Sequence, residues 1–128
     1  MPGIRSAKEM VAEANAAVEA VPPARAVALT GDPDVVFVDV RDAAEREKAG
    51  TARGAVHAPR AFLEFLADPA SERHLPALSP DKRLVLFCAT GGRSALAGKT
   101  LRDMGFGRVA HIPGGFPAWK EAGGPTEE

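Results

Sequence analysis

Residues 84–105 constrain the fold most, because they follow the pattern of a buried strand, a tight loop and a helix in immediate succession. Residues 84–87 form a continuous apolar run, which is typical of a strand covered on both faces. The glycines at 91 and 92 interrupt this run. Helical spacing then places three apolar side chains on one face: Ala97, Leu101 and Met104. Gly105 stands where a glycine ends many helices.

Cys88, the only cysteine of the chain, falls where this strand ends. A glycine-bearing loop that enters a helix directs several backbone N–H groups into one concavity, and the helix N-terminus adds positive potential there. A thiol in such a place is biased toward the thiolate, its nucleophilic and oxidisable form, which we expect to be exposed. Arg93 adds a permanent cation with forked donors. The predicted site is therefore the nucleophile Cys88 with an anion-binding loop of Ala89, Thr90, Gly91, Gly92, Arg93 and Ser94.

The length of the loop bears on its chemistry. Four residues separate Cys88 from Arg93, whereas cysteine-dependent phosphatases have one more and wrap a tetrahedral phosphate. The segment resembles the active loop Cys-x-x-Gly-x-Arg-Ser of the rhodanese family of sulfurtransferases, which Cys88, Gly91, Arg93 and Ser94 match in place. The resemblance implies that Cys88 carries one extra sulfur atom as a persulfide.

Two flanking segments extend this resemblance to roughly residues 19–125. The first has the family's Asp-Val-Arg, acidic residue and Gly-Ala pattern, and the second has its closing pattern. The matching residues are Asp39, Val40, Arg41, Glu45, Gly54 and Ala55, and then Gly114, Gly115, Trp119, Gly123 and Pro125. Arg53 and Thr51 depart from the family's usual proline and histidine, at a turn that we expect to lie away from the site.

Most of the flanking residues are interpreted as structural support. A buried carboxylate must be paired, so we expect backbone N–H groups or Arg41 to hold Asp39. Arg41 and Glu45 are four residues apart and are expected to pair, and Trp119 is expected to anchor the core. Arg60, which follows the third predicted strand, is a candidate for the rim of the site, with a solvated surface arginine as the equal alternative.

The three histidines, His57, His74 and His111, are scattered along the chain. None is assigned the role of catalytic base, because a thiolate that its own loop already stabilises does not require one.

Strong strands alternate with helical segments, which predicts an α/β fold with a central, mainly parallel five-stranded sheet and helices on both faces. Ser6 and Glu9 form a capping-box signature for an extra N-terminal helix. Predicted strands cover residues 19–21, 35–40, 55–57, 84–88 and 108–112, and predicted helices cover residues 7–17, 24–29, 42–48, 61–67, 93–104 and 117–122. Phe62, Phe65 and Leu66 mark one face of the helix at 61–67, and residues 68–81 are expected to form a long loop.

The 128 residues are expected to form a single rhodanese-like domain at residues 19–125, with a helical extension at 1–18 and a tail at 126–128. The net charge of −1 gives no bias toward nucleic acid or an anionic membrane. A lone cysteine excludes an internal disulfide and a cysteine-based zinc site. No apolar run is long enough to span a bilayer, and the N-terminus lacks the pattern of a signal peptide. A cytoplasmic location is therefore expected.

The sequence predicts a thiosulfate sulfurtransferase that moves sulfur from thiosulfate or a related donor to cyanide or a thiol. Its expected partners are a small-molecule sulfur donor and a thiol acceptor, and no metal or organic cofactor is expected. Two alternatives stay open: a cysteine phosphatase or arsenate reductase, and a binding module or sulfur carrier that has the fold with little turnover. The physiological donor and acceptor and the oligomeric state stay open as well.

Overall fold

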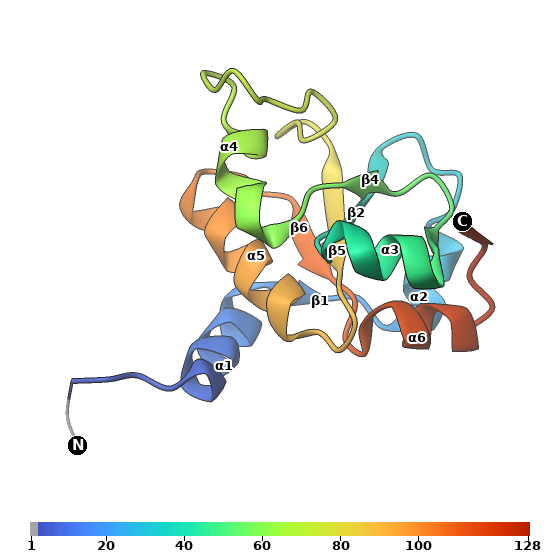
Figure 1. The fold of residues 1–128 in the computed structure, drawn as a ribbon, viewed down its shortest axis with the longest axis horizontal. Coiled ribbons are helices and arrows are strands. Elements are labelled where there is room, and N and C mark those ends of the chain that lie inside the picture. Colours follow the sequence, from blue (N-terminus) through green and yellow to red (C-terminus); the bar gives the residue numbers. More distant parts are fainter. Residues whose placement is uncertain (1–2) are drawn as a thin grey trace.

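The computed structural model describes residues 3–128 and has a five-stranded parallel sheet at its centre (Figure 1). In spatial order the strands are β1 (Glu19–Ala20), β6 (Val109–His111), β5 (Arg83–Phe87), β2 (Val35–Asp39) and β4 (Val56–His57). The predicted α/β fold with a five-stranded sheet is confirmed, and every pairing within this sheet is parallel.

The central strand β5 shows why the sheet is covered on both faces. Alternate side chains of a strand point to opposite faces, so Leu84 and Leu86 enter one buried cluster while Val85 and Phe87 enter the other. All four are fully buried. The carboxyl end of β5 therefore lies in the middle of the molecule, and it delivers Cys88 there.

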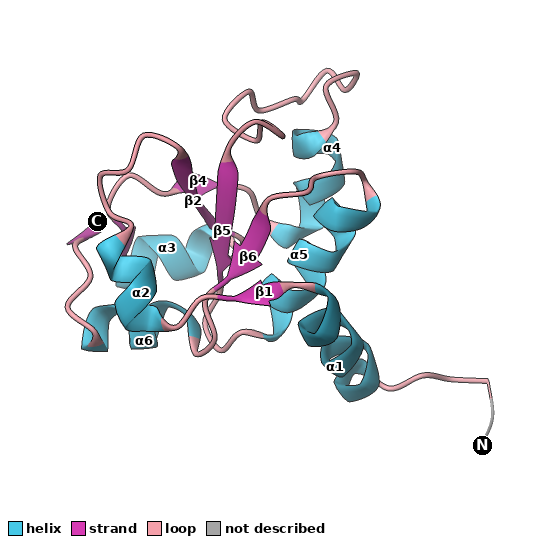
Figure 2. Cartoon of the chain, turned by 180° about the vertical axis from the view of Figure 1, so that it is seen from behind, coloured by secondary structure: helices cyan, strands magenta, loops and turns pink. Residues whose placement is uncertain are grey.

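Helices cover each face of the sheet (Figure 2). One face carries α1 (Ala7–Ala17), the 3₁₀ turn η1 (Arg60–Phe62), α4 (Leu63–Ala67) and α5 (Gly92–Asp103). The other carries α2 (Pro23–Ala28), α3 (Ala43–Ala49) and α6 (Gly115–Glu121). Within residues 3–128, no helix combines the length and the apolar character that crossing a membrane requires.

The predicted N-terminal helix α1 forms with its capping box intact. The Ser6 hydroxyl accepts the Glu9 N–H at 3.0 Å, and the Glu9 carboxylate accepts the Ser6 N–H at 3.1 Å. The helix packs against α5, and a Cβ built on Gly98 of α5 would lie 2.9 Å from Val18. A glycine at 98 therefore permits this close approach, which holds the N-terminal segment against the helix that follows the active loop.

A second, two-stranded antiparallel sheet was not predicted. Strand β3 (Thr51–Ala52) pairs with β7 (Thr126–Glu127), so the segment interpreted as a tail takes part in backbone pairing. Strands of two residues are too short to show a period in sequence.

Two predicted helix faces need correction. In the segment at 61–67 the buried side chains are Leu63 and Ala67, whereas Phe62 and Phe65 are 46% and 58% exposed. The 3₁₀ start of this segment rotates the face that meets the sheet. Met104 lies past the last residue of α5 and is 39% exposed, so it does not continue the buried face of that helix.

Residues 68–81, all of which the structure describes, contain no helix or strand, as predicted. Part of this loop packs against the rest of the domain. Leu78 is fully buried in the core, and the Leu75 N–H donates to the Leu66 carbonyl at 2.8 Å. The loop is therefore anchored beside α4.

Candidate active site

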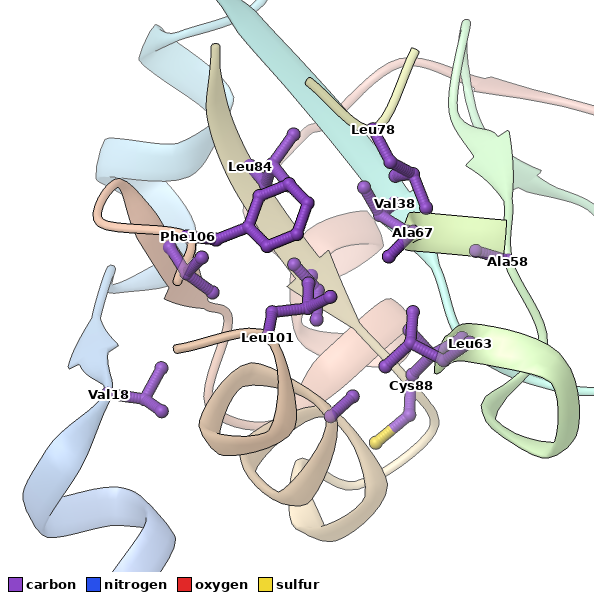
Figure 3. Close-up of a cluster of buried hydrophobic side chains, with 14 residues drawn as sticks. Val18, Val38, Ala58, Leu63, Ala67, Leu78, Leu84, Cys88, Leu101 and Phe106 are labelled. Carbon is purple, nitrogen blue, oxygen red and sulfur yellow. The ribbon is translucent and has the colours of Figure 1, made fainter. Parts of the chain in front are cut away.

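Cys88 lies between the end of β5 and the first turn of α5, and its sulfur points toward that turn (Figure 3). The Sγ atom accepts hydrogen bonds from the Gly91 N–H at 3.1 Å and the Ser94 N–H at 3.4 Å. The Ser94 hydroxyl oxygen lies 3.6 Å from the same sulfur. The structure thus brings Cys88, Gly91 and Ser94 together.

These contacts favour the thiolate. Burial raises the pKa of the Cys88 thiol, but hydrogen bonds from the Ser94 hydroxyl and from the backbone of Ser94, Gly91 and Thr90 outweigh burial, so the pKa is lowered overall. The loop therefore stabilises the thiolate form of Cys88 relative to the thiol.

Two glycines make this loop geometry attainable. Gly91 has a φ of +113°, a conformation that L side chains rarely adopt, and its N–H is the shorter of the two backbone donors to the sulfur. Gly115, the first residue of α6, has a φ of +64°, and a Cβ there would overlap the Cys88 carbonyl. Phe116 N–H donates to that carbonyl at 2.8 Å, so the start of α6 packs directly against the active loop. Gly92, in contrast, is the first residue of α5, and a Cβ there would make only an ordinary contact with the Val11 side chain at 3.9 Å.

The expectation of an exposed thiolate is wrong for this conformation, because Cys88 is fully buried. Its sulfur is turned into the loop, where Ser94 is also fully buried. A donor molecule can therefore reach Sγ only when groups around the loop move aside.

The guanidinium of Arg93 pairs with the carboxylate of Glu45, for which the sequence predicted a different partner. Its Nη1 and Nη2 atoms donate to Glu45 Oε1 and Oε2 at 2.6 and 2.9 Å. These hydrogen bonds lower the pKa of Glu45 to about 2, and they raise the pKa of Arg93. The predicted pair between Arg41 and Glu45 is wrong, because Glu45 of α3 turns toward α5 instead.

Arg41 belongs to a buried hydrogen-bond network around Asp39. Arg41 was one of the two partners expected for this carboxylate. Its backbone N–H and Nε both donate to Asp39 Oδ1 at 3.0 Å, and its Nη2 donates to Oδ2 at 2.8 Å. The Thr51 hydroxyl donates to Asp39 Oδ2 at 2.9 Å, so this departure from the family pattern has a structural role. The Arg41 guanidinium lies 4.6 Å from the Phe116 ring centroid, which connects the network to the start of α6.

A mainly apolar hollow of about 220 Å³ opens beside the active loop. Ala89 and Glu45 reach it from the site, and two lysines border it. Its lining comprises Arg41, Glu45, Lys48, Ala49, Ala89, Phe116, Pro117 and Lys120. Thr90 is exposed, whereas Ala89 is half-buried on the wall of the hollow.

Arg60 is not brought to this loop. It donates to Glu64 at 3.0 Å and to the Thr100 hydroxyl at 3.2 Å. It lines a different hollow, between α1 and α5, whose lining includes none of residues 88–94. A rim role for Arg60 stays a prediction.

Sequence reasoning missed His111 and Asn15. His111 of β6 is 2% exposed, its Nδ1 lies 2.9 Å from the Ser94 hydroxyl, and its Nε2 lies 3.0 Å from Asn15 Oδ1 of α1. No spacing in the sequence marks these contacts, since they join three separate elements. Among residues 3–128, no group of three or more His, Cys, Asp or Glu side chains is placed to hold a metal ion.

Comparison with known proteins identifies several that are similar to this chain. A solved protein of unknown function from Rhodopseudomonas palustris, described as a possible tyrosine phosphatase, is 48% identical, covers 99% of both chains and has a TM-score of 0.92. The polysulfide-sulfur transferase homodimer of Wolinella succinogenes is 36% identical, with 94% of this chain and 85% of that chain covered and a TM-score of 0.74.

A third relative is much longer than this chain. The tRNA uridine(34) hydroxylase of Teredinibacter turnerae is 35% identical over 101 residues, which are 79% of this chain and 30% of the hydroxylase. This chain thus spans less than a third of that curated relative. The model of the Rhodanese-like domain matches residues 22–122, most of the chain. The protein therefore belongs to the rhodanese-like domain family.

Proposed function

We propose that this chain is a thiosulfate sulfurtransferase, which carries a sulfur atom as a persulfide on Cys88. The observation that carries the proposal is the position of Cys88 Sγ at 3.1 and 3.4 Å from the Gly91 and Ser94 N–H groups, inside a loop that Arg93 closes. Such a loop stabilises a thiolate before reaction and the negative charge of a terminal sulfur after it.

The reaction has two balanced steps. The Cys88 thiolate attacks the outer sulfur of thiosulfate or a related donor. A bond forms between Sγ and that sulfur, and the sulfur–sulfur bond of the donor breaks, so that its electron pair leaves with sulfite. A thiol or cyanide then attacks the terminal sulfur of the persulfide, and the electron pair of the broken bond returns to Cys88 as a thiolate.

The relative from Wolinella succinogenes supports transfer of sulfur, because its name assigns it polysulfide-sulfur transfer and the two chains match over most of their lengths. The proposal accordingly names a small-molecule sulfur donor and a thiol acceptor as partners. It also places the protein in the cytoplasm, because a free catalytic thiol requires a reducing compartment.

A second candidate is a tyrosine phosphatase, which the description of the relative from Rhodopseudomonas palustris favours. The same cysteine and arginine would then hold a phosphate. The loop argues against this function, because only four residues separate Cys88 from Arg93 and the space for a tetrahedral oxyanion is correspondingly smaller.

One pair of assays separates the two functions. The protein is incubated with thiosulfate and cyanide, and thiocyanate is measured; in parallel, phosphate release from an aryl phosphate is measured. We expect thiocyanate to form with the parent and not with Cys88→Ser, with no phosphate release above that of the serine variant. Phosphate release that depends on Cys88, without thiocyanate, would replace the proposal with the phosphatase. Absence of both products would favour a binding module.

A further inference from the structure

The active thiol stands at one end of a hydrogen-bonded series that crosses the molecule. From Cys88 Sγ it runs 3.6 Å to the Ser94 hydroxyl, 2.9 Å from there to His111 Nδ1, and 3.0 Å from His111 Nε2 to Asn15 Oδ1. The members come from the active loop, α5, β6 and α1. The buried part of the series is continuous, since Cys88, Ser94 and His111 are each at most 2% exposed.

The direction of each hydrogen bond follows from the last member. Asn15 presents its amide oxygen, which only accepts, so His111 Nε2 carries a proton and donates it. In the neutral imidazole Nδ1 is then unprotonated and accepts the Ser94 O–H at 2.9 Å, for which the Gly91 carbonyl at 3.2 Å is the more distant alternative acceptor. The Ser94 oxygen in turn is free to accept from the Cys88 thiol. Each group therefore donates to the next, from the thiol toward Asn15.

We propose that Ser94 and His111 form a relay that takes up the proton of the Cys88 thiol, with Asn15 fixing the imidazole in the accepting form. In the relay the S–H bond breaks and the proton passes to the Ser94 oxygen. The proton that Ser94 already carried passes to His111 Nδ1. No other reactant is needed, because one proton has moved from sulfur to nitrogen through a hydroxyl.

Every polar group of the relay still has a hydrogen-bond partner after the proton transfer. The thiolate accepts from the Gly91 N–H, the Ser94 N–H and the Ser94 O–H, while Ser94 accepts from the new Nδ1–H of His111. His111 still donates to Asn15 through Nε2. Burial lowers the pKa of His111, so the ring is neutral at rest and has one unprotonated nitrogen. His111 is a positioning residue in this scheme, because it acts on the sulfur through Ser94.

Most charged groups on the neighbouring elements form ion pairs, and Lys8 of α1 and Arg102 of α5 are exposed. Arg93 is the cation nearest in sequence to the relay, and it pairs with Glu45. The remaining pairs on α1, α5, β1 and β5 are Glu13 with Arg5 and Lys99, Lys99 with Asp103, and Glu19 with Arg83. A shift in the titration of Cys88 on changing Asn15 or His111 therefore reports on the relay.

The relay would prepare Cys88 for the proposed sulfur transfer, and in this respect it rests on the proposed function. Its test, however, does not measure sulfur transfer. The thiolate of the folded protein is followed by its ultraviolet absorbance as pH is raised, with Cys88→Ser as the blank. The chain has one cysteine and no tyrosine, so the difference signal belongs to Cys88 alone. The parent is compared with His111→Asn, Asn15→Asp and the control His74→Asn, which changes a histidine in the 68–81 loop.

His111→Asn places an amide where Nδ1 was, which can hydrogen-bond Ser94 but cannot take up a proton. We expect its thiolate to form at higher pH than that of the parent, by about one pH unit, so that the thiolate fraction below both midpoints falls about tenfold. His74→Asn is expected to match the parent.

Asn15→Asp gives the sharper test, because Asn15 is on the exposed side of α1 and its replacement leaves the core intact. A carboxylate at this position stabilises protonated His111, so the thiolate should form at lower pH. A carboxylate that acted on the thiol only through space would raise the thiol pKa instead. The double variant Asn15→Asp/His111→Asn is therefore expected to shift upward.

A titration of His111→Asn or of Asn15→Asp that coincides with the parent's, or an upward shift for Asn15→Asp, would overturn the relay. Thermal melting shows whether His111→Asn is folded, and if it is not, the direction of the Asn15→Asp shift decides alone. The titration does not depend on sulfur transfer, so its result would stand even if the parent transferred no sulfur. A failure of the relay can therefore be distinguished from a failure of the proposed function.

Discussion

Glu45 binds the guanidinium of Arg93 through two hydrogen bonds, 2.6 Å to Nη1 and 2.9 Å to Nη2. The pair joins α3 to the first turn of α5 across 48 positions of sequence. Capping-box contacts between Glu45 and Asp42 hold the carboxylate at the start of α3. The cation of the active loop is thus oriented by a helix that contributes no atom to the cradle of Cys88.

Removing this carboxylate is expected to impair sulfur transfer. In Glu45→Gln the guanidinium keeps its charge and loses its orientation, so kcat/KM for thiosulfate should fall about tenfold, with kcat affected as well as KM. Glu47→Gln, on the same helix, serves as the control. A rise in kcat/KM would show instead that Glu45 competes with the donor for Arg93.

The same pair makes a prediction about stability and pH. The pKa of Glu45 is depressed from 4.5 to about 2, so the pair stabilises the folded state above pH 4.5, and this contribution is lost as pH falls toward 2. Both side chains are partly exposed, 41% for Arg93 and 31% for Glu45, and solvent screening limits the contribution to ~0.5 kcal/mol.

Urea unfolding of the parent and of Glu45→Gln measures this contribution directly. The difference in their free energies of unfolding should be constant from neutral pH down to the ordinary pKa of glutamate and should shrink below it. A difference that disappears well above that pKa would mean that the ion pair does not persist in solution.

Arg93→Lys is expected to separate charge from geometry. Lysine supplies a cation but not the forked donors that Arg93 directs at Glu45 and at an anion. The variant should still form a detectable persulfide, with kcat/KM for thiosulfate reduced by about tenfold or more. Steady-state thiocyanate formation gives the ratio, and parity with the parent would remove Arg93 from the anion site.

The two loop glycines are expected to respond differently to substitution. Gly91→Val forces a β-branched residue into a φ of +113°, in a position packed near the Gly114 backbone, so it should abolish sulfur transfer. Gly92→Ala adds a Cβ at a helical position where it would meet only the Val11 side chain, in ordinary contact, and should retain transfer. Thiocyanate assays on both variants, with melting temperatures as a check on folding, make the comparison. Equal activities would show that the loop does not depend on the conformation of Gly91.

The sequence predicted the parts of the molecule that local pattern determines. The apolar run before Cys88 and the glycines after it were sufficient to place a strand, a loop and a helix, and the Ser6–Glu9 signature placed α1. Such signals arise from residues close together in the chain, where spacing alone determines which groups can meet.

Contacts between distant segments were not predictable in the same way. The spacing of four residues predicted that Glu45 pairs with Arg41. The folded chain shows instead that Arg41 pairs with Asp39, and that Glu45 pairs with Arg93. His111 likewise stands in an apolar strand with no motif around it, and its role depends on where β6 passes α5 and α1. Burial of the Cys88 sulfur was also missed, because side-chain direction at the end of a strand is set by tertiary packing.

The most direct test of the central claim is the mass of the intact protein after treatment with thiosulfate and removal of excess reagent. Because Cys88 is the only cysteine, the account predicts a gain of one sulfur atom, which cyanide removes with formation of thiocyanate and which Cys88→Ser does not acquire. An unchanged mass for the parent, with thiosulfate and with other sulfane donors, would contradict the assignment of Cys88 as a sulfur-carrying nucleophile.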